Sequence, residues 1–326
     1  MNPFAYLRAQ SPPAAFTAIA HEPGARYVAG GTNLLDLMKL EVETPPLLVD
    51  INPLALRAIE ARGDSLFIGA LARLTDVAAD AQVRREFPLV AIALEESASP
   101  QLRNMATIGG NLMQRTRCAY FRDVAMPCNK RHPGSGCSAL DGENRRHAVL
   151  GTSPQCIAVS PSDLAVALVA LDATVHVTSP EGDRDIALDD FYRLPGETPQ
   201  VETALAPHEL IAGVSLPLLR FASRSTYVKV RDRAQYDFAL ASAAVAIDLR
   251  GTTIREARVA LGGVATVPWR CAQAERVLSG APATRERFER AAEAAMSGAH
   301  GRGANDFKIA LGRRTLVRAL ENAVAL

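Results

Sequence analysis

Apolar positions along the first 217 residues fall into short runs separated by turns, as in a domain built from many small elements. Two such runs predict strands at Arg26–Ala29 and Ser65–Leu71. Apolar residues at helical spacing predict a helix that begins at Leu34 and another within Val83–Ser97, entered near Pro88. This irregular mixture of strands and helices predicts an α+β fold.

Polar residues that precede apolar runs predict two further helix starts. Thr75 is the expected N-cap of a helix over Asp76–Ala81. Ser160 is the expected N-cap of a helix that ends at Leu171, with Asp163 at its third position in the manner of a capping box.

The pattern changes after residue 217. Before it, a hairpin is predicted from two strands at 174–178 and 185–188. After it, three strands with alternating or continuous apolar character precede two helices. The expected strands are Ser225–Val230, Ala239–Leu249 and Arg255–Leu261, and the expected helices span 284–296 and 305–320. We therefore divide the chain into domains 1–217 and 218–326.

Residues 115–157 form an insertion of a different kind. Few aliphatic residues occur between 115 and 151, and no periodicity is present. Long irregular segments inside a compact domain are usually functional or disordered. Four of the five cysteines lie here or at its end, while Cys271 stands apart as a structural thiol. The clustered cysteines are Cys118, Cys128, Cys137 and Cys156.

Composition and charge exclude several classes of protein. Apolar residues make up 48% of the 326 residues, so the chain has enough apolar surface to fold. The net charge of +1 lacks the basic excess typical of nucleic-acid binding. No apolar run approaches the roughly 20 residues of a membrane span. The N-terminus lacks the pattern of a signal peptide, which predicts a cytoplasmic protein unless a signal-bearing partner carries it to the periplasm.

Two Gly-Gly pairs lie in similar settings, at 29–33 (AGGTN) and 107–111 (TIGGN). Glycine lets a backbone approach a ligand closely, and a helix that follows directs free N–H groups toward phosphate. Neither segment has the G-x-G-x-x-G spacing of a dinucleotide fingerprint. The pairs are interpreted either as plain turns or as two parts of a site for one phosphate-bearing ligand.

The cysteine spacing favours an iron-sulfur cluster over other ligands. Structural zinc sites usually contain C-x₂₋₄-C pairs, and none occurs here. A 4Fe-4S cluster also needs four thiolates and accepts them from an irregular loop. Seven Lys or Arg residues against three Asp or Glu between 115 and 146 are expected to favour thiolate. A zinc site and four unliganded cysteines stay as alternatives. His132 and His147 receive no role, because four cysteines already saturate such a cluster.

Five segments resemble, in order, the FAD-binding subunits of molybdenum hydroxylases such as xanthine dehydrogenase and carbon monoxide dehydrogenase. They are AGGTNLLDLMK, QLRNMATIGGNL, SPSDL, HELIAGVSLP and YVKVRDR. The insertion, with RTRCAYFRDVAMPCNKRHPGSGCSAL, resembles the FAD and 4Fe-4S subunit of bacterial periplasmic aldehyde oxidoreductases. The resemblance implies a two-subdomain, PCMH-like FAD-binding domain followed by a smaller α+β domain like that of carbon monoxide dehydrogenase flavoproteins.

The resemblance also implies a set of site residues. Residues 27–34 would wrap the FAD pyrophosphate, Met113 would lie near the flavin ring, and Lys229 would stabilise reduced flavin. From its strand context alone, Lys229 is instead interpreted as a solvated charge. The implied FAD contacts are Arg26, Tyr27, Val28, Ala29, Gly30, Gly31, Thr32, Asn33, Leu34, Thr107, Gly110, Asn111, Met113, Asp163, Ile211 and Lys229. The implied 4Fe-4S ligands are Cys118, Cys128, Cys137 and Cys156.

The function implied is electron transfer within a heterotrimeric aldehyde oxidoreductase. A large partner subunit would carry the molybdenum cofactor, and a small partner would carry 2Fe-2S clusters. This chain would pass electrons from FAD to an external acceptor and would contribute no catalytic residue of its own. The alternatives are a zinc-stapled or cluster-free flavoprotein subunit of a xanthine or hydroxybenzoyl-CoA type hydroxylase, and a self-standing flavin oxidoreductase.

Overall fold

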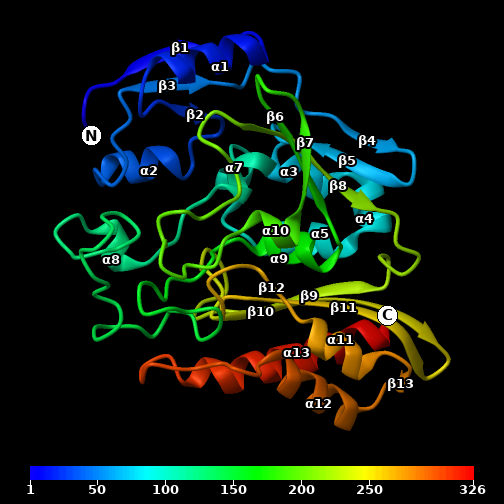
Figure 1. The fold of residues 1–326 in the computed structure, drawn as a ribbon. Helices are drawn as coiled ribbons and strands as arrows, with labels where there is room; N and C mark the ends of the chain where they lie inside the picture. The colour runs from blue at the N-terminus through cyan, green and yellow to red at the C-terminus, as the bar shows by residue number, and fades with distance from the viewer.

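The N-terminal subdomain is a small parallel sheet in a computed structural model that describes all 326 residues. Its strand order is β1-β3-β2, and its core is formed by the sheet with the first helix. In Figure 1 this blue subdomain lies at the top of the molecule. Its elements are β1 (Ala5–Arg8), α1 (Pro12–His21), β2 (Arg26–Val28), α2 (Leu34–Lys39) and β3 (Leu47–Asp50).

The second subdomain is a five-stranded antiparallel sheet with helices packed on it. Its order is β4-β5-β8-β6-β7, so β8 returns late in the chain to lie between β5 and β6. The strands are β4 (Ile59–Arg62), β5 (Ser65–Gly69), β6 (Thr174–Thr178), β7 (Arg184–Ala187) and β8 (Leu210–Pro217). The helices are α3 (Leu74–Ala79), α4 (Ala81–Glu86), α5 (Pro88–Glu95), α6 (Pro100–Arg103), α7 (Ile108–Leu112), α9 (Asp163–Ala170) and α10 (Leu188–Phe191).

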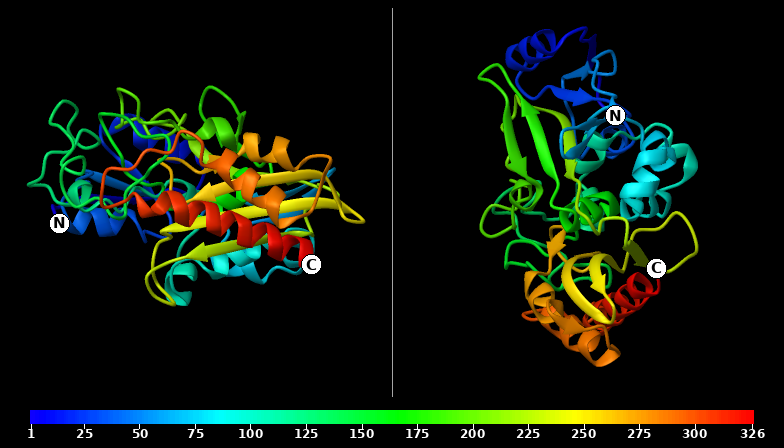
Figure 2. Two further views of the ribbon diagram at one scale, coloured as in Figure 1. Left: turned by 90° about the horizontal axis from the view of Figure 1, so that it is seen from below. Right: turned by 90° about the vertical axis from the view of Figure 1, so that its right-hand side faces the viewer.

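The C-terminal domain is a second antiparallel sheet with three helices, drawn in yellow to red at the bottom of Figure 1. The views in Figure 2 show the long red helix α13 lying along this sheet. The strands are β9 (Ser225–Val230), β10 (Ala241–Arg250), β11 (Thr253–Gly262), β12 (Trp269–Arg270) and β13 (Ala281–Pro282). The helices are α11 (Ala272–Leu278), α12 (Arg285–Ala295) and α13 (Phe307–Ala325).

Strand β10 joins the cores of the two domains. Successive side chains of a strand point to opposite faces of its sheet. On one face, Ala244 and Ala246 belong to the core that contains α5 and α9. On the other face, Ala243, Val245 and Ile247 belong to the core under α11 and α13. Both faces of β10 are therefore buried, which explains the continuous apolar run of its sequence.

Two predicted N-caps are wrong. Helix α9 begins at Asp163, and the Ser162 hydroxyl caps it by accepting from the Ala165 N–H at 2.9 Å. The Ser160 N–H instead donates to the Ala265 carbonyl, which holds that residue outside the helix. Helix α3 begins at Leu74, and the hydroxyl of Thr75 donates to Asn104 rather than capping.

The helix predicted within Val83–Ser97 is present from its expected entry at Pro88, but the residues before the proline belong to a separate helix. The chain forms α4 up to Glu86 and a separate α5 from Pro88. Proline has no N–H to donate and restricts the residue before it, so a helix seldom passes through it.

The insertion contains one short helix, α8 (Ala119–Arg122), and is otherwise irregular. Its last part is bound by two fully buried polar side chains that precede or begin α13. The Asn305 amide donates to the carbonyls of His147 and Ala148, at 3.4 and 3.0 Å. The Lys308 ammonium donates to the carbonyls of Arg146 and His147, at 3.1 and 3.0 Å. These contacts from the C-terminal domain hold a segment that has few apolar contacts of its own.

No helix in the structure combines the length and the apolar character that crossing a bilayer requires.

Replacement of Asn305 by alanine should destabilise the protein by about 1–3 kcal/mol, because the buried Ala148 carbonyl loses its donor and the His147 carbonyl loses one of two. Denaturant unfolding of Asn305→Ala and wild type measures this difference. Asn322→Ala, at an exposed position of the same C-terminal helix, is the matched control and should change the unfolding free energy little. Equal stabilities for Asn305→Ala and wild type would show that this contact does not hold the insertion.

Candidate functional site

A large cavity lies between the N-terminal and second subdomains. Its volume is about 690 Å³, within the range of small-molecule and cofactor sites. The turn between β2 and α2 forms one wall, and α7 with the segments around 158–161 and 192–211 forms the other. The cavity is thus built from parts of the chain that are distant in sequence.

The two glycines of the AGGTN turn are required by the local backbone, and the turn also lines the cavity. Gly31 has φ +69°, a left-handed conformation that favours glycine. A Cβ on Gly30 would lie 2.0 Å from the Met105 carbonyl oxygen, so Gly30 is required by the close approach of the 105–106 backbone. The amide Nδ2 of Asn33, also in this wall, is buried without a hydrogen-bond partner. An acceptor on a bound ligand would satisfy it.

The TIGGN segment is a helix start rather than a Gly-Gly turn, which corrects the prediction. Thr107 caps α7 by accepting from the Gly110 N–H at 3.2 Å. A Cβ on Gly109 would lie 3.0 Å from the Ala70 Cβ, so this glycine is required by packing against the second sheet. Gly110 lines the cavity, and an added Cβ there would approach only the Thr107 hydroxyl. Gly110 is therefore the glycine at which a larger side chain would enter the cavity.

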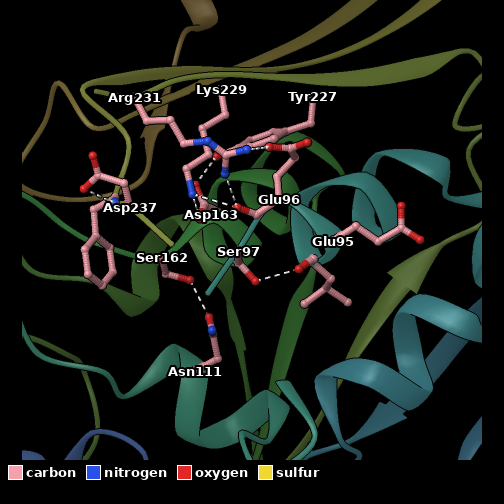
Figure 3. Close-up of polar contacts among 12 residues, drawn as sticks. Glu95, Glu96, Ser97, Asn111, Ser162, Asp163, Tyr227, Lys229, Arg231 and Asp237 are labelled. Atoms are coloured by element: carbon pink, nitrogen blue, oxygen red, sulfur yellow. Dashed lines mark hydrogen bonds and ion pairs between the residues drawn. The ribbon is translucent and has the colours of Figure 1, made fainter. Parts of the chain in front are cut away.

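The structure brings most of the expected contacts to this cavity. Its lining contains Arg26, Tyr27, Val28, Ala29, Gly30, Gly31, Thr32, Asn33, Leu34, Thr107, Gly110, Met113 and Ile211. Three expected contacts, Asn111, Asp163 and Lys229, are not part of the lining. The Asn111 side chain accepts a hydrogen bond from the Ser162 hydroxyl at 2.6 Å (Figure 3).

Asp163 and Lys229 form a buried ion pair at the boundary between the domains (Figure 3). Their charged atoms lie 2.8 Å apart, and their side chains are 6% and 1% exposed. The Tyr227 hydroxyl donates to the same carboxylate at 2.7 Å, and Lys229 also donates to the Glu96 carbonyl. Burial raises the pKa of Asp163, and the ion pair with Lys229 opposes that shift. The interpretation of Lys229 as a solvated strand charge is wrong.

A charged group in the cavity wall was not anticipated from the sequence. Glu202 lies between Arg115 and Lys130, with ion pairs of 2.5 and 2.8 Å. Burial would raise the pKa of Glu202, but these two cations hold it below its usual value. Arg115 also pairs with Glu43. Only the fold brings these four residues together, so no local motif could have indicated them.

All four clustered cysteines line a second, small cavity that is enclosed by the insertion. None forms a disulfide, and Cys128 and Cys137 are partners in a short antiparallel bridge. Cys156 also lines the large cavity, as do Lys130 and Ala158, so the two cavities adjoin. No three His, Cys, Asp or Glu side chains are grouped closely enough to hold a metal ion. The four cysteines therefore line one small cavity without forming a group compact enough for a single metal ion.

The basic character of the insertion does not lower the pKa of Cys118 or Cys156, contrary to the prediction. Burial raises the pKa of Cys118 to about 12 and also raises that of Cys156. Several of the cations are paired with carboxylates: Arg145 with Asp232 at 2.8 Å, for example. Burial thus outweighs the local excess of positive charge.

One contact in this region escaped the sequence analysis. The Nε2 atom of His147 lies 3.1 Å from the Cys118 sulfur. The two residues are 29 positions apart, and no spacing rule connects them. Cys271 lies instead in the core of the C-terminal domain, 3% exposed.

Comparisons with known proteins agree with this architecture. The family described as "FAD binding domain in molybdopterin dehydrogenase" matches residues 2–219. The family described as "CO dehydrogenase flavoprotein C-terminal domain" matches residues 226–323.

Two curated relatives and one solved structure illustrate the similarity. The aldehyde oxidoreductase FAD-binding subunit PaoB of Escherichia coli is 51% identical over 100% of this chain and 99% of its own length. The glyceraldehyde dehydrogenase medium chain of Sulfolobus acidocaldarius is 30% identical over 85% of this chain and 81% of its own. A structure of carbon monoxide dehydrogenase from Hydrogenophaga pseudoflava superposes with a TM-score of 0.77, at 27% identity, covering 100% and 99% of the two chains.

Two subdomains around a glycine-bordered cavity, followed by a sheet-and-helix domain, define an FAD-binding protein of the oxidoreductase class. The chain belongs to the family of FAD-binding subunits of molybdenum hydroxylases. The predicted α+β fold, with an FAD-binding domain and a carbon monoxide dehydrogenase flavoprotein C-terminal domain, is confirmed.

Lys229→Met should lower the unfolding free energy by about 3–5 kcal/mol, because it leaves the Asp163 carboxylate buried without its cation. The double variant Asp163→Leu/Lys229→Met should be more stable than Lys229→Met, because it removes both charges. Denaturant unfolding of the single and double variants measures the coupling.

Arg85→Met, which breaks an exposed pair with Glu86, is the control and should cost less than about 1 kcal/mol. A coupling free energy near zero between positions 163 and 229 would contradict the assignment of a buried pair.

Proposed function

We propose that this chain is the FAD- and 4Fe-4S-containing electron-transfer subunit of a molybdenum-dependent aldehyde oxidoreductase. Its FAD would receive electrons from 2Fe-2S clusters on a small partner subunit and deliver them to an external acceptor. A large partner subunit with the molybdenum cofactor would oxidise the aldehyde. The observation that carries the proposal is that four free cysteines surround a small cavity adjoining the large one.

The large cavity is the proposed FAD site. Its volume, the unpartnered amide of Asn33 and the open approach at Gly110 support a ligand with polar acceptors there. When bound, FAD supplies a carrier that exchanges electrons singly or in pairs. The lining residues named above would contact it directly. Asn111, Asp163 and Lys229 would act from behind the cavity wall, through the Asn111–Ser162 hydrogen bond and the start of α9.

The small cavity is the proposed 4Fe-4S site, with Cys118, Cys128, Cys137 and Cys156 as ligands. Four thiolates are the donor set that such a cluster requires. A cluster bound here would be held by these four sulfurs together, an arrangement that does not require them to form one compact group around a single ion. Cysteines that line one cavity without forming such a group suit a cluster better than zinc. When bound, the cluster supplies a one-electron redox centre.

The relatives support the proposed partners and substrate class. PaoB is named as a subunit of an aldehyde oxidoreductase, and the Sulfolobus relative as the medium chain of a glyceraldehyde dehydrogenase. The identity of 51% along the full chain favours an aldehyde over other substrates. The first family match ends at residue 219 and the second begins at residue 226. This break also supports our division into domains 1–217 and 218–326.

Serine at any one of the four clustered cysteines should lower the iron content of the purified protein severely, because each thiolate is a proposed ligand. Iron analysis and the visible absorption beyond the flavin bands measure this loss. Cys271→Ala is the control and should keep its iron, because Cys271 is packed in the C-terminal core. Iron retained in two of the four serine variants, or zinc in place of iron in wild type, would refute the cluster assignment.

Gly110→Leu should reduce bound FAD by at least about tenfold, because the new side chain enters the cavity without meeting other backbone. Flavin released by denaturation, relative to protein, measures the occupancy. Ala14→Leu adds the same side chain type at an exposed position of α1 and should keep normal flavin. Normal occupancy in a folded Gly110→Leu variant would remove α7 from the proposed site.

A further inference from the structure

His147 is the one side chain in the structure that makes a hydrogen-bond contact with any of the four clustered cysteine sulfurs. Its Nε2 atom lies 3.1 Å from the Cys118 sulfur, and the residue is 6% exposed. The other hydrogen bonds to these sulfurs come from backbone N–H groups, such as that of Ala158 to Cys156 at 3.4 Å. Cys118 is therefore distinguished from the other three cysteines by a polar neighbour.

The proton of the imidazole is best placed on Nε2. A neutral imidazole carries one N–H. The Nδ1 atom is buried without a partner, and a buried N–H without an acceptor is costly. A proton on Nε2 has the sulfur as its acceptor, so this tautomer leaves no donor unpaired.

The ring is held in place by the C-terminal domain. The His147 carbonyl accepts from Lys308 at 3.0 Å and from Asn305 at 3.4 Å, and both of these side chains are fully buried. The His147 N–H donates to the Asn144 carbonyl at 2.8 Å. The peptide groups on both sides of the His147 Cα are therefore held by hydrogen bonds, so the imidazole extends toward Cys118 from a fixed segment of backbone.

We propose that His147 donates an N–H···S hydrogen bond to the Cys118 thiolate and thereby raises the reduction potential of the cluster. This inference rests on the proposed 4Fe-4S site. A donor to a ligating sulfur withdraws electron density from it, and hydrogen bonds to the sulfurs are among the factors that set cluster potentials. A bound cluster would supply the one-electron chemistry, and His147 would act on it only through the Cys118 sulfur.

The test compares His147→Leu and His147→Gln with wild type in the assembled complex. Iron content is measured first, followed by a redox titration monitored by electron paramagnetic resonance. His147→Leu removes the donor and should shift the ratio of reduced to oxidised cluster about tenfold toward oxidised at a fixed potential. For a one-electron couple, this shift is about 59 mV downward. His147→Gln retains an N–H donor and should recover most of the wild-type potential.

His132→Leu is the matched control, because this exposed histidine lies in the same insertion and makes no side-chain contact with a cysteine. Its potential should equal that of wild type. A wild-type potential in iron-replete His147→Leu would overturn the inference. Absence of iron from wild type would instead refute the proposed cluster, so the two failures are distinguishable.

A second measurement needs no variant and covers the case in which His147→Leu fails to retain iron. Pulsed electron-nuclear resonance of the reduced wild-type cluster should show an exchangeable proton and a weakly coupled imidazole nitrogen. Loss of the proton signal in deuterated water would identify the exchangeable donor. Absence of both couplings from an iron-replete protein would overturn the inference.

Discussion

The insertion between residues 115 and 157 cannot be held by apolar burial of its own, and this constraint shapes the region around the proposed cofactors. It contains a single short helix, yet four of its thiols surround one cavity. Polar side chains from elsewhere replace the missing core: Asn305 and Lys308 bind its backbone from the C-terminal domain. Glu202 binds Lys130 of the insertion from the second subdomain. Both domains therefore contribute to the position of the cysteines.

Burial rather than net charge controls the electrostatics of the site. The insertion is basic in sequence, but much of its positive charge is paired, and burial raises the pKa of Cys118 and Cys156. Lys229 is likewise neutralised by Asp163, so the proposed FAD would experience the field of a pair rather than that of a free cation. This pair lies where β9 of one domain meets α9 of the other. The Asp163–Lys229 ion pair therefore links the two domains. It does so at the start of α9, next to residues 160 and 161 of the cavity wall.

The sequence predicted what depends on local patterns or on resemblance. The two domains, the strands β9, β10 and β11, and the cavity wall formed by residues 26–34 were expected, because each has a continuous signal along the chain or in the resemblance. The predictions were wrong where the local sequence allows two structures and a contact with a distant residue selects one of them. Ser160 and Ser162 are both plausible caps, and the hydrogen bond from Ser160 to Ala265 in the other domain selects Ser162. His147 escaped prediction because its contact with Cys118 spans 29 residues of irregular chain.

The account depends most on the claim that two different redox cofactors occupy adjoining cavities of this one chain. Iron, acid-labile sulfide and flavin, determined together on the purified protein, test this claim most directly. The account predicts about four iron atoms, about four sulfides and about one FAD per chain, as a single 4Fe-4S cluster beside one flavin requires. Full flavin occupancy with about one zinc atom, or with no metal at all, would contradict it.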